Sequence, residues 1–94
     1  MAIVVKVANG RVEEYENGSL QRSYASNAVD AATDGDIVAV VTSDGRVEEY
    51  RWGSCQRSYA SNALKVQVNG GTVVVTTKDG RIEEYVGGSC QRSY

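Results

Sequence analysis

The stretch Gly45-Arg46-Val47-Glu48-Glu49-Tyr50 recurs almost unchanged at Gly10–Tyr15 and Gly80–Tyr85, so its copies are 35 residues apart. Each copy is followed by Gly-Ser-x-Gln-Arg-Ser-Tyr, at 18–24, 53–59 and 88–94. A fixed period of this length is typical of stacked supersecondary units. The sequence therefore predicts a single domain over 1–94 made of three repeats, a partial one at 1–28 and others at 29–63 and 64–94.

Asn-Gly and Asp-Gly pairs separate short β-prone runs along the chain. Such pairs favour two-residue type I′ hairpin turns, because both turn residues adopt positive φ. No segment has a helical period, and the chain has no proline. Each full repeat therefore predicts a four-stranded antiparallel meander, with strands of the third copy at 64–68, 72–78, 81–86 and 89–94. The expected turns are Asn9–Gly10, Asn17–Gly18, Asp34–Gly35, Asp44–Gly45, Trp52–Gly53, Asn69–Gly70, Asp79–Gly80 and Gly87–Gly88.

The first repeat is shorter than the other two. Met1 enters directly on the second strand of its unit, so about eleven strands are expected. Segment 1–10 has one lysine and a short apolar run, which indicates a strand and not a signal peptide. No stretch approaches the roughly 20 apolar residues of a membrane span. We therefore expect no membrane partner.

A two-residue turn at 87–88 also predicts the pairing of the last two strands. Tyr85 would lie opposite Cys90, and Glu84 opposite Gln91. The same register, applied to all three repeats, predicts the cross-strand ion pairs Glu13–Arg22, Glu48–Arg57 and Glu83–Arg92. It also predicts contacts between arginine and tyrosine side chains, at Arg11–Tyr24, Arg46–Tyr59 and Arg81–Tyr94. Cys55 and Cys90 stand where the first repeat has Leu20, which predicts buried thiols and a reducing, cytoplasmic setting.

The phrase Asp-Gly-Arg-Val/Ile-Glu-Glu-Tyr, between the second and third strands of a unit, resembles the matching turn of WD-type β-propeller blades. Sheets that are apolar on both faces, with a polar last strand, suit such blades. Because propellers typically have roughly four to eight blades, three repeats do not close a ring. The fold expected first is thus all-β, with β-propeller-like blades completed by homo-oligomerisation, as a dimer or larger.

A second resemblance is to the bulb-type mannose-binding lectins, which are β-prisms of three four-stranded sheets. Of their Gln-x-Asp-x-Asn-x-Val-x-Tyr motif, the second repeat has Asp44 and Tyr50, and the third has Asp79 and Tyr85. The first repeat has Tyr15 alone. This resemblance implies a β-prism closed within one chain and a carbohydrate ligand. A trefoil closed within one chain is a further alternative.

The polar strands are more alike between repeats than the apolar strands. Sixteen of nineteen residues are identical between 10–28 and 45–63, but only five of sixteen between 29–44 and 64–79. One hypothesis is therefore a multivalent, lectin-like protein that binds a carbohydrate or another small polar or anionic ligand, such as a nucleotide, at repeated sites. The candidate ligand-binding residues are Tyr15, Tyr50, Tyr85, Arg46, Arg81, Glu48, Glu83, Asp44, Asp79, Arg57 and Trp52.

The alternative hypothesis is a structural or protein-interaction module, in which the same residues only hold strands together. Catalysis is not indicated, because the chain has no histidine and its two cysteines lie in separate repeats. Adjacent glutamates point to opposite faces of a strand and form no paired-carboxylate site. We therefore predict no enzyme, no metal ligand and no cofactor. The net charge of −2 disfavours nucleic acid as a partner.

Overall fold

The fold is all-β. The computed structural model describes residues 3–94, and these residues form eleven strands, as expected. The strands are β1 (Ile3–Ala8), β2 (Arg11–Glu16), β3 (Ser19–Tyr24), β4 (Ala28–Thr33), β5 (Val38–Thr42), β6 (Val47–Arg51), β7 (Ser54–Tyr59), β8 (Ala63–Asn69), β9 (Thr72–Thr77), β10 (Ile82–Val86) and β11 (Ser89–Ser93). Among the described residues there is no helix that could cross a membrane.

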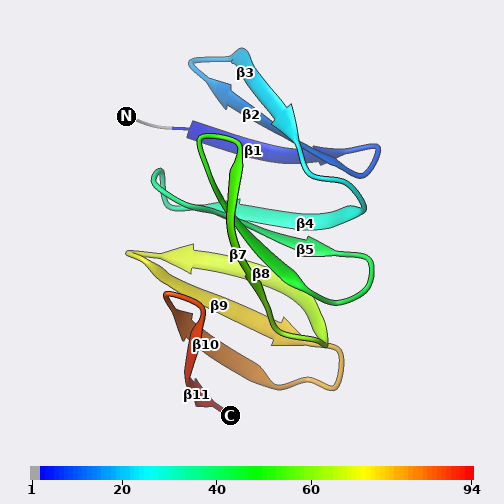
Figure 1. Cartoon of the computed structure of the whole chain (residues 1–94), viewed down its shortest axis with the longest axis vertical. Coiled ribbons are helices and arrows are strands. Elements are labelled where there is room, and N and C mark those ends of the chain that lie inside the picture. Colours follow the sequence, from blue (N-terminus) through cyan, green and yellow to red (C-terminus); the bar gives the residue numbers. More distant parts are fainter. Residues whose placement is uncertain (1–2) are drawn as a thin grey trace.

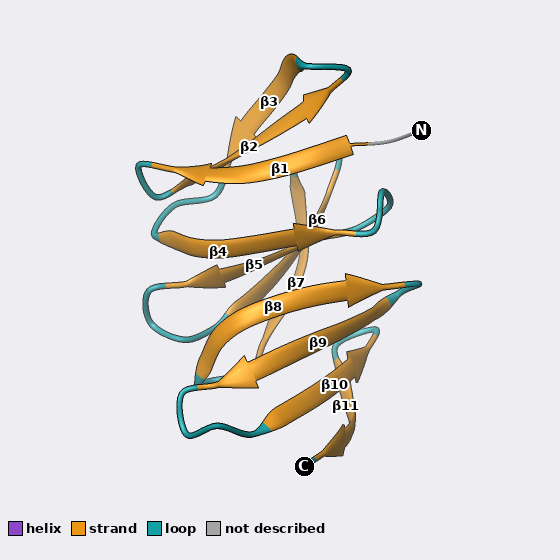
Figure 2. Ribbon diagram, turned by 180° about the vertical axis from the view of Figure 1, so that it is seen from behind, coloured by secondary structure: helices purple, strands orange, loops and turns teal. Residues whose placement is uncertain are grey.

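The strands form three antiparallel sheets that follow one another along the chain. The first sheet is β1–β3, the second is β4–β7 and the third is β8–β11, and in each sheet sequence neighbours are spatial neighbours. Figure 1 shows the three sheets arranged along the 38 Å long axis, with β2 and β3 at one end and β10 and β11 at the other. Seen from behind, β1, β4 and β8 lie side by side (Figure 2), and β4 contacts both of the others. The predicted meander is confirmed within each sheet.

Glycine-containing turns join the strands, although not all have the predicted length. Two-residue turns with both residues at positive φ occur, as predicted, at Asn9–Gly10, Asn17–Gly18, Trp52–Gly53 and Gly87–Gly88. The turn predicted at Asn69–Gly70 lies one residue later, at Gly70–Gly71. The turns at Asp34–Gly35, Asp44–Gly45 and Asp79–Gly80 are longer than predicted. The aspartate side chains explain the difference, because each accepts a hydrogen bond within its own turn and so stabilises a wider loop.

A β-bulge in the outer hairpin of each sheet changes the predicted register. Tyr85 lies opposite Cys90, as expected, but Glu84 lies opposite Arg92. Gln91 is the extra residue between these two pairs, and its amide donates a hydrogen bond to the Ser89 carbonyl oxygen at 3.1 Å. The same bulge occurs in the first and second sheets, at Gln21 and Gln56.

The bulge makes the predicted cross-strand ion pairs wrong. One extra residue moves the pairing by one position, so each arginine meets the second glutamate of its Glu-Glu pair and not the first. The observed pairs are Glu14–Arg22, Glu49–Arg57 and Glu84–Arg92, in place of those predicted for Glu13, Glu48 and Glu83. The predicted arginine–tyrosine contacts change too, because the Nε atoms of Arg11, Arg46 and Arg81 donate to the hydroxyl groups of Ser23, Ser58 and Ser93.

Two apolar cores fill the spaces between the sheets. β5 is buried along its whole length, and its side chains alternate between the two cores. Val38 and Val40 lie in the core shared with the first sheet, whereas Ala39 and Val41 lie in the core shared with the third. The continuous apolar run in this segment thus reflects a strand that is buried on both faces.

The two cysteines are exposed, so the prediction of buried thiols is wrong. Cys55 and Cys90 are free thiols on β7 and β11, the outermost strands of their sheets. Leu20, at the same position on β3, is exposed as well. Exposure is set by the position along the strand and not by the place of the strand in the sheet, because Tyr59 on the same strand β7 is buried.

Candidate functional site

Strand alternation sorts the repeated polar residues onto two different faces of each sheet. We call the face toward the next sheet in chain order the forward face, and the opposite one the rear face. In the second sheet, Glu49, Arg57 and Tyr59 lie on the forward face. Glu48 and Tyr50 lie on its rear face, toward the first sheet.

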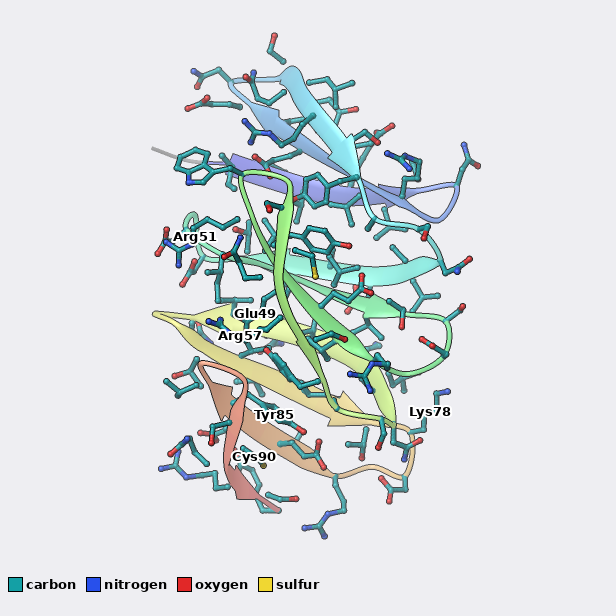
Figure 3. The ribbon with its side chains drawn as sticks, in the orientation of Figure 1. Glu49, Arg51, Arg57, Lys78, Tyr85 and Cys90 are labelled. Atoms are coloured by element: carbon teal, nitrogen blue, oxygen red, sulfur yellow. The ribbon has the colours of Figure 1, made fainter. Side chains whose placement is uncertain are left out.

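A buried carboxylate lies on the forward face of the first and second sheets. Glu49 is only 2% exposed and accepts hydrogen bonds from Arg57, at 2.5 Å, and from the Tyr59 hydroxyl. Figure 3 shows Glu49 and Arg57 side by side where the second sheet meets the third. In the first sheet the same contacts are made by Glu14, Arg22 and Tyr24. Two donors to one carboxylate compensate for the hydration that burial removes.

Tyrosine pairs join each forward face to the rear face of the next sheet. The rings of Tyr59 and Tyr85 stack with their centres 4.6 Å apart, and those of Tyr24 and Tyr50 with their centres 4.8 Å apart. Burial, together with a hydrogen bond to Glu83, raises the pKa of Tyr85 to about 12. Burial also raises the pKa of the other three hydroxyl groups. These pairs are therefore neutral packing elements of the inter-sheet contacts.

Several predicted ligand-binding residues belong to these inter-sheet contacts. Tyr50 and Tyr85 are buried, so their rings face tyrosines of the neighbouring sheet and not solvent. Glu48 and Glu83 accept hydrogen bonds from the hydroxyl groups of these tyrosines, each at 2.8 Å. Tyr15 is less buried than its two counterparts, and its hydroxyl donates to Glu13 at 2.9 Å.

Other predicted ligand-binding residues stabilise turns and hairpins. Asp44 accepts a hydrogen bond from the Thr42 hydroxyl, which lowers the pKa of its carboxyl group. Arg46 Nε donates to the Ser58 hydroxyl at 3.1 Å. The same contacts recur in the third sheet for Asp79, Thr77, Arg81 and Ser93. These predicted residues thus have partners within their own sheet.

Trp52 differs from the other predicted residues because its ring is open to solvent. It lies in the turn between β6 and β7 and is 71% exposed. The guanidinium carbon of Arg22 lies 5.8 Å from its ring centre, within the range of a cation–π contact. Trp52 and Arg22 line a cleft between the first and second sheets, together with Glu14, Glu16 and Asp36. The cleft therefore combines an aromatic ring, a guanidinium group and three carboxylates.

A second cleft lies at the equivalent place between the second and third sheets. It is lined by Glu49, Arg51, Arg57, Gly71 and Gly87, among others. Gly87 stands one repeat after Trp52, so this cleft has no aromatic ring at that position. The two clefts thus differ in chemistry. Among the described residues, no group of three or more His, Cys, Asp or Glu side chains could hold a metal ion.

The residues at the centre of the inter-sheet contacts are missing from the set predicted from the sequence. Glu49 and Tyr59 recur in all three repeats just as Glu48 and Tyr50 do. The extra residue before each arginine moves the arginine onto the second glutamate, and no feature of the sequence marks it. Periodicity alone does not reveal such a bulge.

A comparison with protein families shows which family the chain resembles. The family model described as "Helicobacter pylori IceA2 protein" matches residues 1–59 and, a second time, residues 49–94. The two matches together span the chain, and their succession agrees with its internal repetition. No curated protein matches the chain.

A comparison with solved structures identifies the fold. The crystal structure of BamB from Moraxella catarrhalis, a β-propeller protein, superposes with a TM-score of 0.77 at 19% sequence identity. The match covers 98% of this chain and 32% of that protein, so the chain spans about a third of its length. At this identity the likeness concerns the fold alone. The three sheets are thus β-propeller-like, as the blade interpretation predicted, and the comparison lends no support to the β-prism.

Proposed function

We propose that this chain, which belongs to the family described as Helicobacter pylori IceA2 protein, is a structural or protein-interaction module of β-propeller type. The engagement of the repeated polar residues with one another supports this proposal. Within residues 3–94, no buried side-chain nitrogen or oxygen lacks a hydrogen-bond partner. The repeated glutamate, arginine and tyrosine side chains thus have the role that a structural module assigns to them, which is to hold strands and sheets together.

Self-association is part of the proposed function. Three propeller-like sheets fall short of the roughly four blades of a small ring. A second copy brings the total to twice three sheets, which lies within the usual range. A homodimer is therefore the simplest particle in which the sheets share one closed ring, and larger rings are the alternative.

Two measurements on the wild-type protein test this function. Native mass spectrometry should give at least twice the chain mass of 10.1 kDa. Thermal unfolding in the presence of a panel of sugars and nucleotides should show no ligand-dependent rise in melting temperature. A particle of one chain mass would contradict self-association. A saturable rise in melting temperature with any sugar or nucleotide would instead favour ligand binding.

A second candidate function is the lectin-like binding of a small polar or anionic ligand, and the surroundings of Trp52 favour it. The exposed indole ring offers a stacking surface, and Arg22 lies next to it. Because Trp52 is the only tryptophan of the chain, its fluorescence reports directly on this cleft. Titration with sugars and nucleotides should then quench or shift the emission in a saturable way. Emission that is unchanged across the panel would remove this candidate.

A further inference from the structure

We propose that the forward face of the third sheet binds the rear face of the first sheet in a second copy of this chain. The forward face is formed by Glu84, Arg92 and Tyr94, and the rear face by Val4, Tyr15 and Gly18. The inference rests on the proposed self-association and names the surfaces that carry it.

The same two faces already meet twice within the chain. The forward-face tyrosines Tyr24 and Tyr59 stack on the rear-face tyrosines Tyr50 and Tyr85 of the next sheet. The third forward face carries the same cluster, since Glu84 accepts hydrogen bonds from both Arg92 and Tyr94. A second copy would therefore meet a surface whose side chains are already arranged as they are in the two internal contacts.

A glycine on the rear face provides a second point of contact. A Cβ atom added to Gly53 would lie 3.0 Å from Arg22 Cδ, and one added to Gly88 would lie 2.8 Å from Arg57 Cδ. The arginine of each forward face thus packs directly against the glycine of the next sheet. Gly18 has the same place in the first sheet, and a Cβ atom added there would have no neighbour within 4 Å among the described residues. Arg92 of a second copy would pack there.

Exposure separates these two faces from the internal ones. Tyr94 is 59% exposed, whereas Tyr24 and Tyr59 are 7% and 9% exposed. Val4 lies opposite Tyr15, as Val38 lies opposite Tyr50, yet Val4 is 64% exposed and Val38 only 2%. Removing these apolar surfaces from water would stabilise the contact between two copies.

Val29 shows that not every exposed apolar residue marks such a face. It is 54% exposed, and Leu64, its counterpart one repeat later, is also exposed. The exposure therefore belongs to this position in the repeat and does not depend on a missing neighbour. Val29 is for this reason a matched control for Val4.

Lys6 is the main difference between the proposed contact and the internal ones. It lies opposite Glu13, at the position that Val40 occupies opposite Glu48. Its Nζ atom is 4.0 Å from Glu13 and 5.6 Å from the ring centre of Tyr15. Val40 is 0% exposed in the internal contact, so the proposed contact would cover Lys6 as well. Glu13 is then the partner that keeps the Lys6 ammonium group paired.

The proposed contact is head-to-tail, because the two faces differ. A head-to-tail contact repeats until the assembly closes. Two copies close with two identical contacts and bring together twice three sheets, within the roughly four to eight blades of a propeller. The expected particle is therefore a dimer with a twofold axis.

Substitution of one residue on each face tests the proposal in the full chain. Native mass spectrometry and gel filtration with light scattering should give twice 10.1 kDa for the wild type and for Val29→Asp. The variants Val4→Asp and Tyr94→Asp should each fall to a single chain mass, because each places a charge in an apolar contact. Circular dichroism should show that all variants keep the β-spectrum of the wild type.

Mixing the two defective variants gives the sharpest readout. A chain with Val4→Asp retains Tyr94, and a chain with Tyr94→Asp retains Val4, so the mixture can form one intact head-to-tail contact. A heterodimer in the mixture alone would support the proposal. A wild-type monomer would overturn both this contact and the proposed self-association. An oligomer that persists in Val4→Asp and Tyr94→Asp would overturn this contact only, and would leave self-association through another face.

Discussion

The second glutamate of the Glu-Glu pair is the charged residue at the centre of each inter-sheet contact. At Glu49 the carboxylate is removed from water, and only Arg57 and Tyr59 replace its hydration. Glu84 makes the same two contacts but is 16% exposed, because no sheet covers it in residues 3–94. The same chemical group thus lies in two environments within one chain, which makes a controlled comparison possible.

Replacing this glutamate by glutamine should lower the free energy of unfolding most where the glutamate is buried. We expect Glu49→Gln to reduce the free energy of unfolding by about 1–3 kcal/mol, since Arg57 loses a charge-assisted partner. Glu84→Gln should cost clearly less, because water can hydrate the groups that remain. Urea unfolding of both variants in the Val4→Asp background excludes any contribution from association. Equal losses would show that burial does not set the cost.

The buried tyrosines predict a loss of stability at alkaline pH. The pKa of Tyr85 is raised from 10.0 to about 12 in the folded protein, first by burial and then by the hydrogen bond to Glu83. Between these two values the unfolded chain loses the proton that the folded chain retains. The free energy of unfolding should therefore be constant below pH 10 as far as this group is concerned, and should fall as the pH rises toward 12. Denaturant unfolding of Tyr85→Phe should show a shallower fall than the wild type.

At the scale of elements, the turns and linkers set how one sheet follows another. The linker between the second and third sheets passes beneath the turn at Gly45, where the Ala63 N–H donates to the Gly45 carbonyl oxygen at 2.8 Å. A Cβ atom at Gly45 would lie 2.8 Å from the Ser61 carbonyl oxygen. Gly80 has nearly the same φ, +86° against +84°, but open space around its Cα. The two glycines therefore differ only in the approach of the linker.

Alanine at these two glycines should separate backbone strain from crowding. Gly80→Ala introduces the left-handed penalty alone, about 1–2 kcal/mol. Gly45→Ala adds a clash with backbone that cannot move without displacing the linker, so we expect the larger drop in melting temperature there. Thermal unfolding followed by circular dichroism measures both. A greater loss for Gly80→Ala would show that the linker adapts freely.

At the scale of the whole molecule, stability and association are coupled. If two copies share a ring, unfolding separates them, and dilution then favours the unfolded state. The melting temperature of the wild type should rise by roughly 4 °C for each tenfold increase in concentration, from the unfolding entropy of two such chains. The melting temperature of Val4→Asp should not depend on concentration. A wild-type melting temperature that is independent of concentration would argue against a shared ring.

Local patterns explain why much of the fold could be predicted. The strands, their order within each sheet and four of the two-residue turns depend on residues that are close in sequence, such as Asn17–Gly18 and the apolar run of β5. The faces of the outer strands could not be predicted, because the bulge at Gln56 moves Arg57 from Glu48 to Glu49. The burial of Tyr50 could not be predicted for a different reason, because its ring is covered by Tyr24 of the first sheet and not by any residue close to it in sequence.

The sequence by itself determined a three-unit, all-β chain, because repetition, turn residues and strand length are all encoded locally. Only the tertiary structure decided which side of each strand is covered, since a one-residue shift sends every following side chain to the opposite face. It also distinguished identical residues by their neighbours. Tyr59 is buried because another sheet packs against it, whereas Tyr94, in the same sequence context, is exposed.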